Sequence, residues 1–202
     1  MYIPAPTTEA QSVASAMNLN SLLAPLHLLS FSGLLGTQLY QTFVVTKICY
    51  TSLPRSAFTT LQKSLFPIYF RSQSLLLLLT VVTIPSRGPL TLLANKASWI
   101  PFAIAGATAT LNWLIYGPRT RKLMIEGTHQ ETRDRLQKQK LIDDPDNDAK
   151  GAVAETPSPE MQRIRRAFSR SHAMSIHLNL LTIGAMLWWG YKLGSSLNLK
   201  LK

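Results

Sequence analysis

The sequence has one cysteine, Cys49, so the chain cannot form an internal disulfide bond. It also lacks the CxxC and Cys/His spacings that bind zinc. No Lys or Arg precedes Lys47, and Glu9 is the only acid before that point. The first 20 residues therefore have neither the basic region of a secretory signal nor the arginines of a mitochondrial presequence.

Motifs for catalysis and cofactor binding are equally scarce. The sequence has no GxSxG, GxGxxG or P-loop pattern, and its serines have no placed His/Asp partner. His27 and the pair His172 and His177 fall near opposite ends of apolar segments, roughly 20 Å apart along a helix axis. We therefore predict no catalytic residue, no metal site, no cofactor and no enzymatic activity.

Long apolar runs dominate what is present. A helix needs about 20 apolar residues to cross roughly 30 Å of hydrocarbon. Four segments meet this length, and each is apolar on all sides, whereas the helices of a soluble bundle keep a polar stripe. The sequence predicts an all-α, integral membrane four-helix bundle over residues 22–202, with spans at about 22–46, 66–84, 97–116 and 172–193.

The remaining segments are polar. Residues 1–21 are predicted to be a flexible tail, and residues 117–171 a loop in which an acidic, proline-rich stretch, 143–159, is a disordered linker. Gly117-Pro118 is expected to end the third helix. Ser158-Pro159-Glu160 is expected to cap a basic helix that continues into the fourth span.

The distribution of positive charge predicts an orientation. Connections that remain in the cytosol retain Lys and Arg. Of the 21 Lys and Arg residues, 16 lie between the first and second spans, in the first part of the second, or between the third and fourth, which leaves 5 for the other side. We therefore expect both termini to face away from the cytosol, in an endomembrane or the plasma membrane.

Few polar side chains interrupt the spans, and those few fall at one depth. Gln41, Arg71 and Asn112 lie within about 8 Å of the predicted cytosolic end of their span, and Asn179 lies within about 11 Å. Amide and guanidinium groups are costly in hydrocarbon unless they are paired. We expect them to form, with Gln38, a polar layer inside the bundle; the alternative is that Arg71 reaches the lipid phosphates and the amides pair locally.

Basic residues flank the third and fourth spans and are candidates for contacts with anionic lipid headgroups, unless they only fix the topology. Membrane lipids are thus the expected partners, with a homo-oligomer or another membrane protein possible, and no nucleic acid. The headgroup candidates are Arg119, Arg121, Lys122, Arg163, Arg165, Arg166 and Arg170.

Four stretches, taken in order, resemble the transmembrane protein 205 family. They are HLLSFSGLLGTQLYQTFV from His27, LPRSAFTTLQKSLFPIYF from Leu53, LNWLIYGPRTRKLM from Leu111 and FSRSHAMSIHLNLL from Phe168. The resemblance implies a multi-pass membrane protein and assigns no biochemical activity. We expect a structural or interaction role in a membrane; the alternative is a small-solute or drug transporter that uses the polar layer.

Overall fold

The computed structural model describes residues 19–85, 96–143 and 157–196. Within these ranges the chain forms four helical rods and no strand. The first rod joins α2 (Leu19–Leu39), the π-helical turn η1 (Tyr40–Val45) and α3 (Thr46–Ser52), and the second is α4 (Arg55–Val82). The third joins α6 (Lys96–Leu111), the π-helical turn η2 (Asn112–Tyr116) and α7 (Gly117–Asp143), and the fourth is α8 (Pro159–Ser196).

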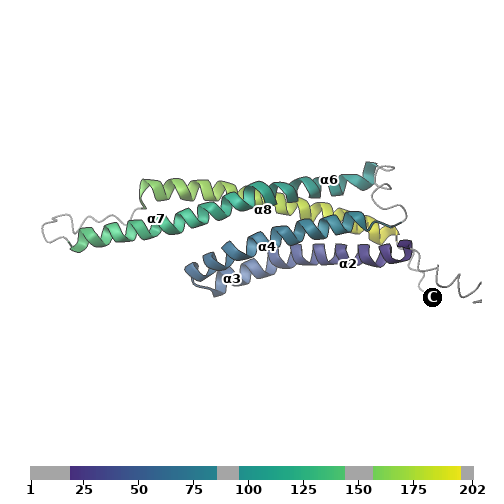
Figure 1. Ribbon diagram of the computed structural model, residues 1–202, viewed down its shortest axis with the longest axis horizontal. Helices are drawn as coiled ribbons and strands as arrows, with labels where there is room; N and C mark the ends of the chain where they lie inside the picture. The colour runs from purple at the N-terminus through teal and green to yellow at the C-terminus, as the bar shows by residue number, and fades with distance from the viewer. Residues whose placement is uncertain (1–18, 86–95, 144–156, 197–202) are drawn as a thin grey trace, which may run out of the picture.

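The rods pack as two antiparallel pairs. Figure 1 shows α2, α3 and α4 as one layer, and α6, α7 and α8 as the other. The second half of α7 and the first turns of α8 extend past the end of the first layer, so these two helices form the far end of the described part of the chain (Figure 1). The prediction of an all-α bundle of four helices is confirmed.

Three rods are long and apolar enough to cross a membrane: residues 22–52, 55–82 and 98–143. α8 is not among them, although it has 38 residues, about 57 Å of helix. Its first half is basic and its second half carries His177, Asn179 and Thr182 among the apolar residues. The expectation of a fourth span thus stays a prediction.

The third rod differs from the expectation that Gly117-Pro118 ends a helix. The chain continues through this pair into α7. The Gly117 N–H donates to the Asn112 carbonyl five residues back, so a wider π turn precedes Pro118. This turn gives the proline ring the space that a regular helix denies it, because the clash with the carbonyl four residues back is relieved.

α7 was expected to be part of a loop, and it is a 27-residue helix. Side-chain pairs four residues apart support it, including Lys122 with Glu126 at 3.8 Å and Glu131 with Arg135 at 2.9 Å. Such exposed pairs contribute only a few tenths of a kcal/mol each. No proline interrupts the helix after Pro118, and this pattern is the signal that the loop interpretation missed.

The start of α8 follows the predicted cap. The Met161 N–H donates to the Ser158 hydroxyl at 3.2 Å, and Pro159 occupies the first helical position. Residues 144–156 of the predicted disordered linker and residues 1–18 of the predicted tail lie outside the described residues.

The apolar core lies toward the end of the bundle that holds the start of α2 and the end of α8. Its large buried side chains include Phe31, Leu34, Phe102 and Met186, and Ala105 packs among them. His27, buried beside this core, accepts from Trp189 Nε1 through Nε2 at 3.2 Å and donates through Nδ1 to the Thr80 carbonyl at 2.8 Å. Thr80 belongs to the last turn of α4, so His27 satisfies a carbonyl that the helix end leaves without an intrahelical partner.

Gly190 lets α8 approach α2 closely. A Cβ atom at this position would lie 2.8 Å from the Phe31 ring, nearer than any side chain tolerates. Gly36, in contrast, has nothing within 4 Å of an added Cβ. The two positions therefore provide a matched pair for testing the packing of the core.

We expect Gly190→Ala to lower the free energy of unfolding by about 1–3 kcal/mol, because the added methyl group forces Phe31 out of its place. The measurement is an SDS titration of the purified protein in mixed micelles. Gly36→Ala serves as the control and should leave stability unchanged or slightly raised, since alanine favours helix. Equal losses for both variants would contradict this packing.

Candidate functional site

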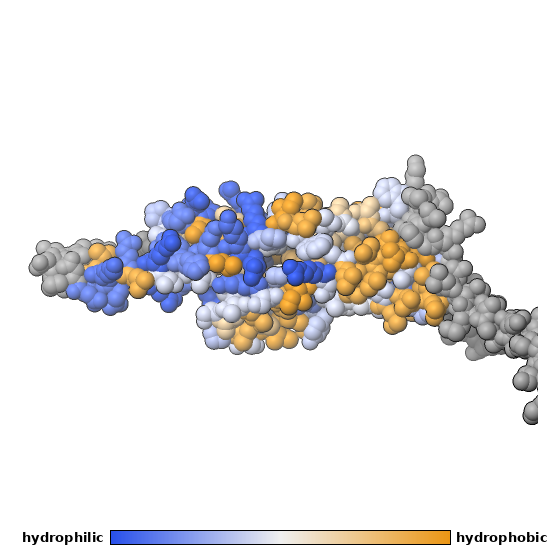
Figure 2. All heavy atoms as spheres, viewed as in Figure 1, coloured by the Kyte–Doolittle hydropathy of each residue, from blue (hydrophilic) through white to orange (hydrophobic). Residues whose placement is uncertain are grey.

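The bundle has polar side chains inside and apolar side chains outside. Gln38, Asn112 and Thr182 are fully buried, whereas Leu29, Ile68 and Leu114 are more than half exposed. Water would favour the reverse arrangement, but lipid favours this one, because hydrocarbon accepts leucine and cannot satisfy an amide. Figure 2 shows the hydrophobic surface gathered over the bundle and the hydrophilic surface over the end formed by α7.

The interior polar residues lie from the middle of the bundle toward the end that holds α3. We call this set of residues the polar seam. All four rods contribute to it, through amide and hydroxyl side chains that are buried or partly buried. Its members are Gln38, Thr42, Gln62, Tyr69, Gln73, Thr108, Asn112, Thr120, Ser171, Ser175, Asn179 and Thr182.

Asn179 joins the two layers of the bundle. Its Oδ1 atom accepts from the Tyr69 hydroxyl at 2.8 Å and from Gln73 Nε2 at 3.4 Å. Its Nδ2 atom donates to the Thr42 hydroxyl in η1 at 2.9 Å. One side chain of α8 thus bonds to both rods of the other layer.

Other seam residues bond within one layer. Asn112 Nδ2 donates to the Ser175 carbonyl at 3.0 Å. Two hydroxyl pairs link the third rod to α8: Thr108 with Thr182 at 2.7 Å, and Thr120 with Ser171 at 2.9 Å. Together these bonds hold the third and fourth rods as a unit.

Several seam amides have no hydrogen-bond partner among the described residues. Both amide atoms of Gln38 and both of Gln62 are unpaired, although these side chains are at most 1% exposed. Gln73 Oε1 and Asn112 Oδ1 are unpaired as well. Leaving a buried polar group unpaired costs about 1–3 kcal/mol, so this concentration calls for an explanation.

The structure brings some members of the predicted polar layer together and leaves others apart. Asn112 and Asn179 both bond within the seam, and Gln38 lies one turn before Thr42 on the same rod. Gln41 bonds locally instead, donating to the Thr46 hydroxyl at 3.5 Å.

Arg71 does not face the bundle interior, contrary to the expectation of a layer that includes it. Its side chain is exposed and makes no hydrogen bond or ion pair with any residue in the described ranges. The reason is its place on α4: Phe70, Gln73 and Leu77 form the inner face, and Arg71 shares the outer face with Leu75. This placement fits the alternative in which the guanidinium reaches the lipid phosphates.

The sequence interpretation missed the α4 part of the seam. Gln62, Tyr69 and Gln73 recur at intervals of seven and four residues, which places them on one face of the helix. Gln62 precedes residue 66, where the sequence predicts that the second span begins, so it falls outside the predicted polar layer. The spacing together with the longer α4 would have found all three.

The predicted headgroup residues all lie on α7 or the basic part of α8 and are exposed. Arg121 donates to the Lys63 carbonyl at 3.2 Å, and Lys122 and Arg163 pair with Glu126 and Glu160 on their own helices. The other four have no ion-pair partner in the described part of the chain: Arg119, Arg165, Arg166 and Arg170.

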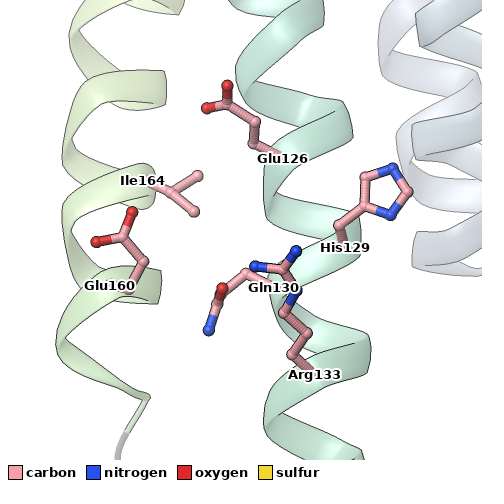
Figure 3. A pocket seen from close by; sticks show the side chains of 6 residues that line it. All are labelled: Glu126, His129, Gln130, Arg133, Glu160 and Ile164. Atoms are coloured by element: carbon pink, nitrogen blue, oxygen red, sulfur yellow. The ribbon is translucent and has the colours of Figure 1, made fainter.

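A groove of about 510 Å³ lies between α7 and α8, beyond the end of the polar seam. Figure 3 shows Glu160 and Ile164 entering it from α8, and Glu126, Gln130 and Arg133 from α7, which also contributes His129. The lining combines both signs of charge with one apolar side chain. Among the described residues no three His, Cys, Asp or Glu side chains form a group that could hold a metal ion.

An all-helical bundle with an apolar outer surface, a polar interior and three rods able to span a bilayer defines a helical membrane protein. The model of a domain of unknown function, DUF4149, matches residues 29–129, half of the chain, and the chain belongs to this family. The match includes the seam residues on the first three rods and stops before α8.

The chain is also similar to the xanthocillin biosynthesis cluster protein D of Aspergillus fumigatus. The two are 37% identical over 177 residues, which cover 88% of this chain and 92% of the relative. No solved structure matches the chain. Neither match carries the transmembrane protein 205 name, so that resemblance stays a prediction.

We expect Asn179→Leu to lower the free energy of unfolding by about 2 kcal/mol, because three interhelical bonds of roughly 0.6 kcal/mol each are lost. Tyr69→Phe removes one of the same bonds, so the double variant should lose less than the two single losses combined. SDS titration of the four proteins in mixed micelles measures this coupling.

Asn179→Leu combined with Thr120→Val is the matched control. Thr120 pairs with Ser171, two turns away from Asn179, and these two losses should add. Additivity in both cycles would show that the Tyr69 hydroxyl and Asn179 do not act together.

Proposed function

We propose that this protein is a non-catalytic interaction component of a cellular membrane, in which the bundle is the anchor and the projecting hairpin of α7 and α8 binds a partner. The observation that carries the proposal is the hairpin itself. α7 extends for about 40 Å and passes beyond the α2 and α4 layer (Figure 1). A helix that served only to connect two spans would not need this length.

Contacts between its two helices support a fixed shape for the hairpin. Met161 and Ile164 of α8 are buried although they lie far from the apolar core. The Ser158 hydroxyl donates to Asp134 of α7 at 2.9 Å. A preorganised surface of this kind favours binding, because little conformational freedom is lost when a partner docks.

The relative from Aspergillus fumigatus supports a partner of a particular kind. Its name assigns it to a xanthocillin biosynthesis cluster. By analogy, we propose that the hairpin holds a soluble biosynthetic protein at the membrane surface. The outer surface of the hairpin carries charges of both signs, which suits a polar and reversible contact.

The proposed topology places the hairpin in the cytosol. α8 then crosses the membrane as a fourth span beside α6, and both termini lie on the other side. The unpaired arginines near the ends of the third and fourth spans would contact anionic lipid headgroups, each contributing about 1 kcal/mol. This arrangement follows the distribution of Lys and Arg.

The experiment for the interaction role is site-specific photo-cross-linking in the native membrane. A photoreactive residue at Arg133, in the groove, should yield a discrete adduct with another protein. The same residue at Tyr191, exposed near the end of α8, is the control and should yield none. Absence of protein adducts from Arg133, or the same adduct from Tyr191, would contradict the proposal.

The headgroup contacts make a second prediction. Replacing Arg165, Arg166 and Arg170 by Gln should remove at least about half of the thermal stabilisation that phosphatidylglycerol gives the protein in nanodiscs, since these charges lie beside the bilayer surface. The control replaces Arg133, Arg135 and Lys138 by Gln. These three residues carry the same total charge but lie on α7, farther from the proposed bilayer surface. Equal losses in both triple variants would refute a specific role.

Topology is tested by thiol labelling in a Cys49→Ser background. A cysteine at Arg135 should react with a membrane-impermeant maleimide only when the cytosolic face is accessible. A cysteine at Tyr191 should react only from the opposite face. If both cysteines reacted from the same face, α8 could not cross the membrane once between positions 135 and 191, and the proposed topology would be wrong.

A second function, passage of a small solute, is favoured by one observation: the unpaired amides of Gln38, Gln73 and Asn112 in the middle of the bundle. The seam is closed, because Gln38 and Asn112 are fully buried, so transport would require the helices to separate. Solute flux in liposomes that is lost in Asn112→Leu would support transport.

A further inference from the structure

We infer that the polar seam is a binding site for a small, uncharged, donor-rich solute, closed in this conformation by Asn179 and bounded at one end by an apolar plug. The inference rests on the second proposed function, transport. It names the class of solute and the residues that bind it.

The unpaired amides first indicate a ligand. A leucine or methionine would fill the place of Gln38 without burying two unpaired polar atoms. Hydrogen bonding between the helices does not account for this glutamine either, since the layers are joined by Asn179 and not by Gln38. An outside group that bonds to the amide would account for it.

The absence of charge then restricts the ligand. No Lys, Arg, Asp or Glu is buried among the described residues. Arg71 faces outward, and Lys63, half-buried beside Gln62, donates to the Thr128 hydroxyl. A charged solute would meet no counter-ion inside the bundle and would bear the full cost of leaving water. The seam therefore suits an uncharged solute.

The unpaired atoms further indicate the solute's hydrogen-bonding character. In the middle of the bundle three amide oxygens are unpaired, on Gln38, Gln73 and Asn112, against one amide nitrogen, on Gln38. A complementary solute donates more hydrogen bonds than it accepts at these positions. Urea-like amides have this character, and polyols can also supply the donors because each hydroxyl provides one O–H group, whereas ethers and ketones supply none.

Two features allow the seam to open. Across its middle the layers are joined by the bonds of Asn179 to Thr42, Tyr69 and Gln73, and Gln73 would also bond the solute. The π turns η1 and η2, one in each layer, lie beside it. Such turns are less stable than regular helix and are frequent at functional sites, so they mark where the rods can bend.

The apolar plug closes the other end. Phe31, Phe102 and Met186 are buried there, and the Trp189 ring packs on Phe102 with 4.7 Å between ring centroids. Trp189 is held by its hydrogen bond to His27. A solute in the seam would have to displace this cluster to leave on the side of the termini.

The test measures swelling of proteoliposomes that contain the full chain, with glycerol and urea as uncharged probes and sodium glutamate as the charged probe. We expect the wild-type protein to pass glycerol and urea and to exclude glutamate. Gln38→Leu should reduce the uncharged fluxes by about fivefold or more, the equivalent of one hydrogen bond. Phe102→Ala, which thins the plug, should increase them.

Ser72→Leu is the matched control, because Ser72 is exposed on the outer face of α4. Solute flux through this variant should equal the flux through the wild type. Thermal unfolding checks the fold, and Gln38→Leu should be at least as stable as the wild type, since it removes unpaired amide atoms.

The outcomes separate the two levels of the hypothesis. Flux of glutamate without flux of the uncharged probes would overturn the solute class and leave transport standing. Wild-type flux in Gln38→Leu would overturn the site. No flux of any probe, in the wild type or in Phe102→Ala, would overturn the transport function itself.

Discussion

The structure depends on the need of every polar group inside a bilayer to find a partner within the protein. Water is not available there, so amides and hydroxyls that a soluble protein would expose are turned inward. Asn179, with three bonds to two other rods, meets this need most completely. The leucines take the outer faces for the same reason.

Close packing follows from these inward polar groups. Small hydroxyl side chains such as Thr108 and Thr182 bond only when their helices approach closely. Gly190 permits the same approach at the apolar end, and Gly117 allows Phe70 to pack against the third rod with 3.1 Å to an added Cβ. Gln38 and Gln62 differ from these paired side chains because their amide groups are unpaired, which makes them candidates for a functional rather than a structural role.

The same separation of polar and apolar surface divides the molecule along its length. The helices that form the bundle are apolar outside, whereas α7 and the first half of α8 are charged outside and bury only a few apolar residues, among them Ile164. The bundle is suited to lipid and the hairpin to water. One pair of helices thus continues from the apolar bundle into a charged surface.

The sequence by itself determined the helical membrane architecture, because segment length, apolar character and charge distribution are local properties that lipid selects directly. It also identified Gln38, Asn112 and Asn179, since amides within apolar runs are visible without a fold. Only the tertiary structure decided which side chains bond, that Arg71 faces outward, and that the chain stays helical through Gly117-Pro118. These outcomes depend on how each rod is rotated against its neighbours and on the π turn at Asn112, which shifts the helical register.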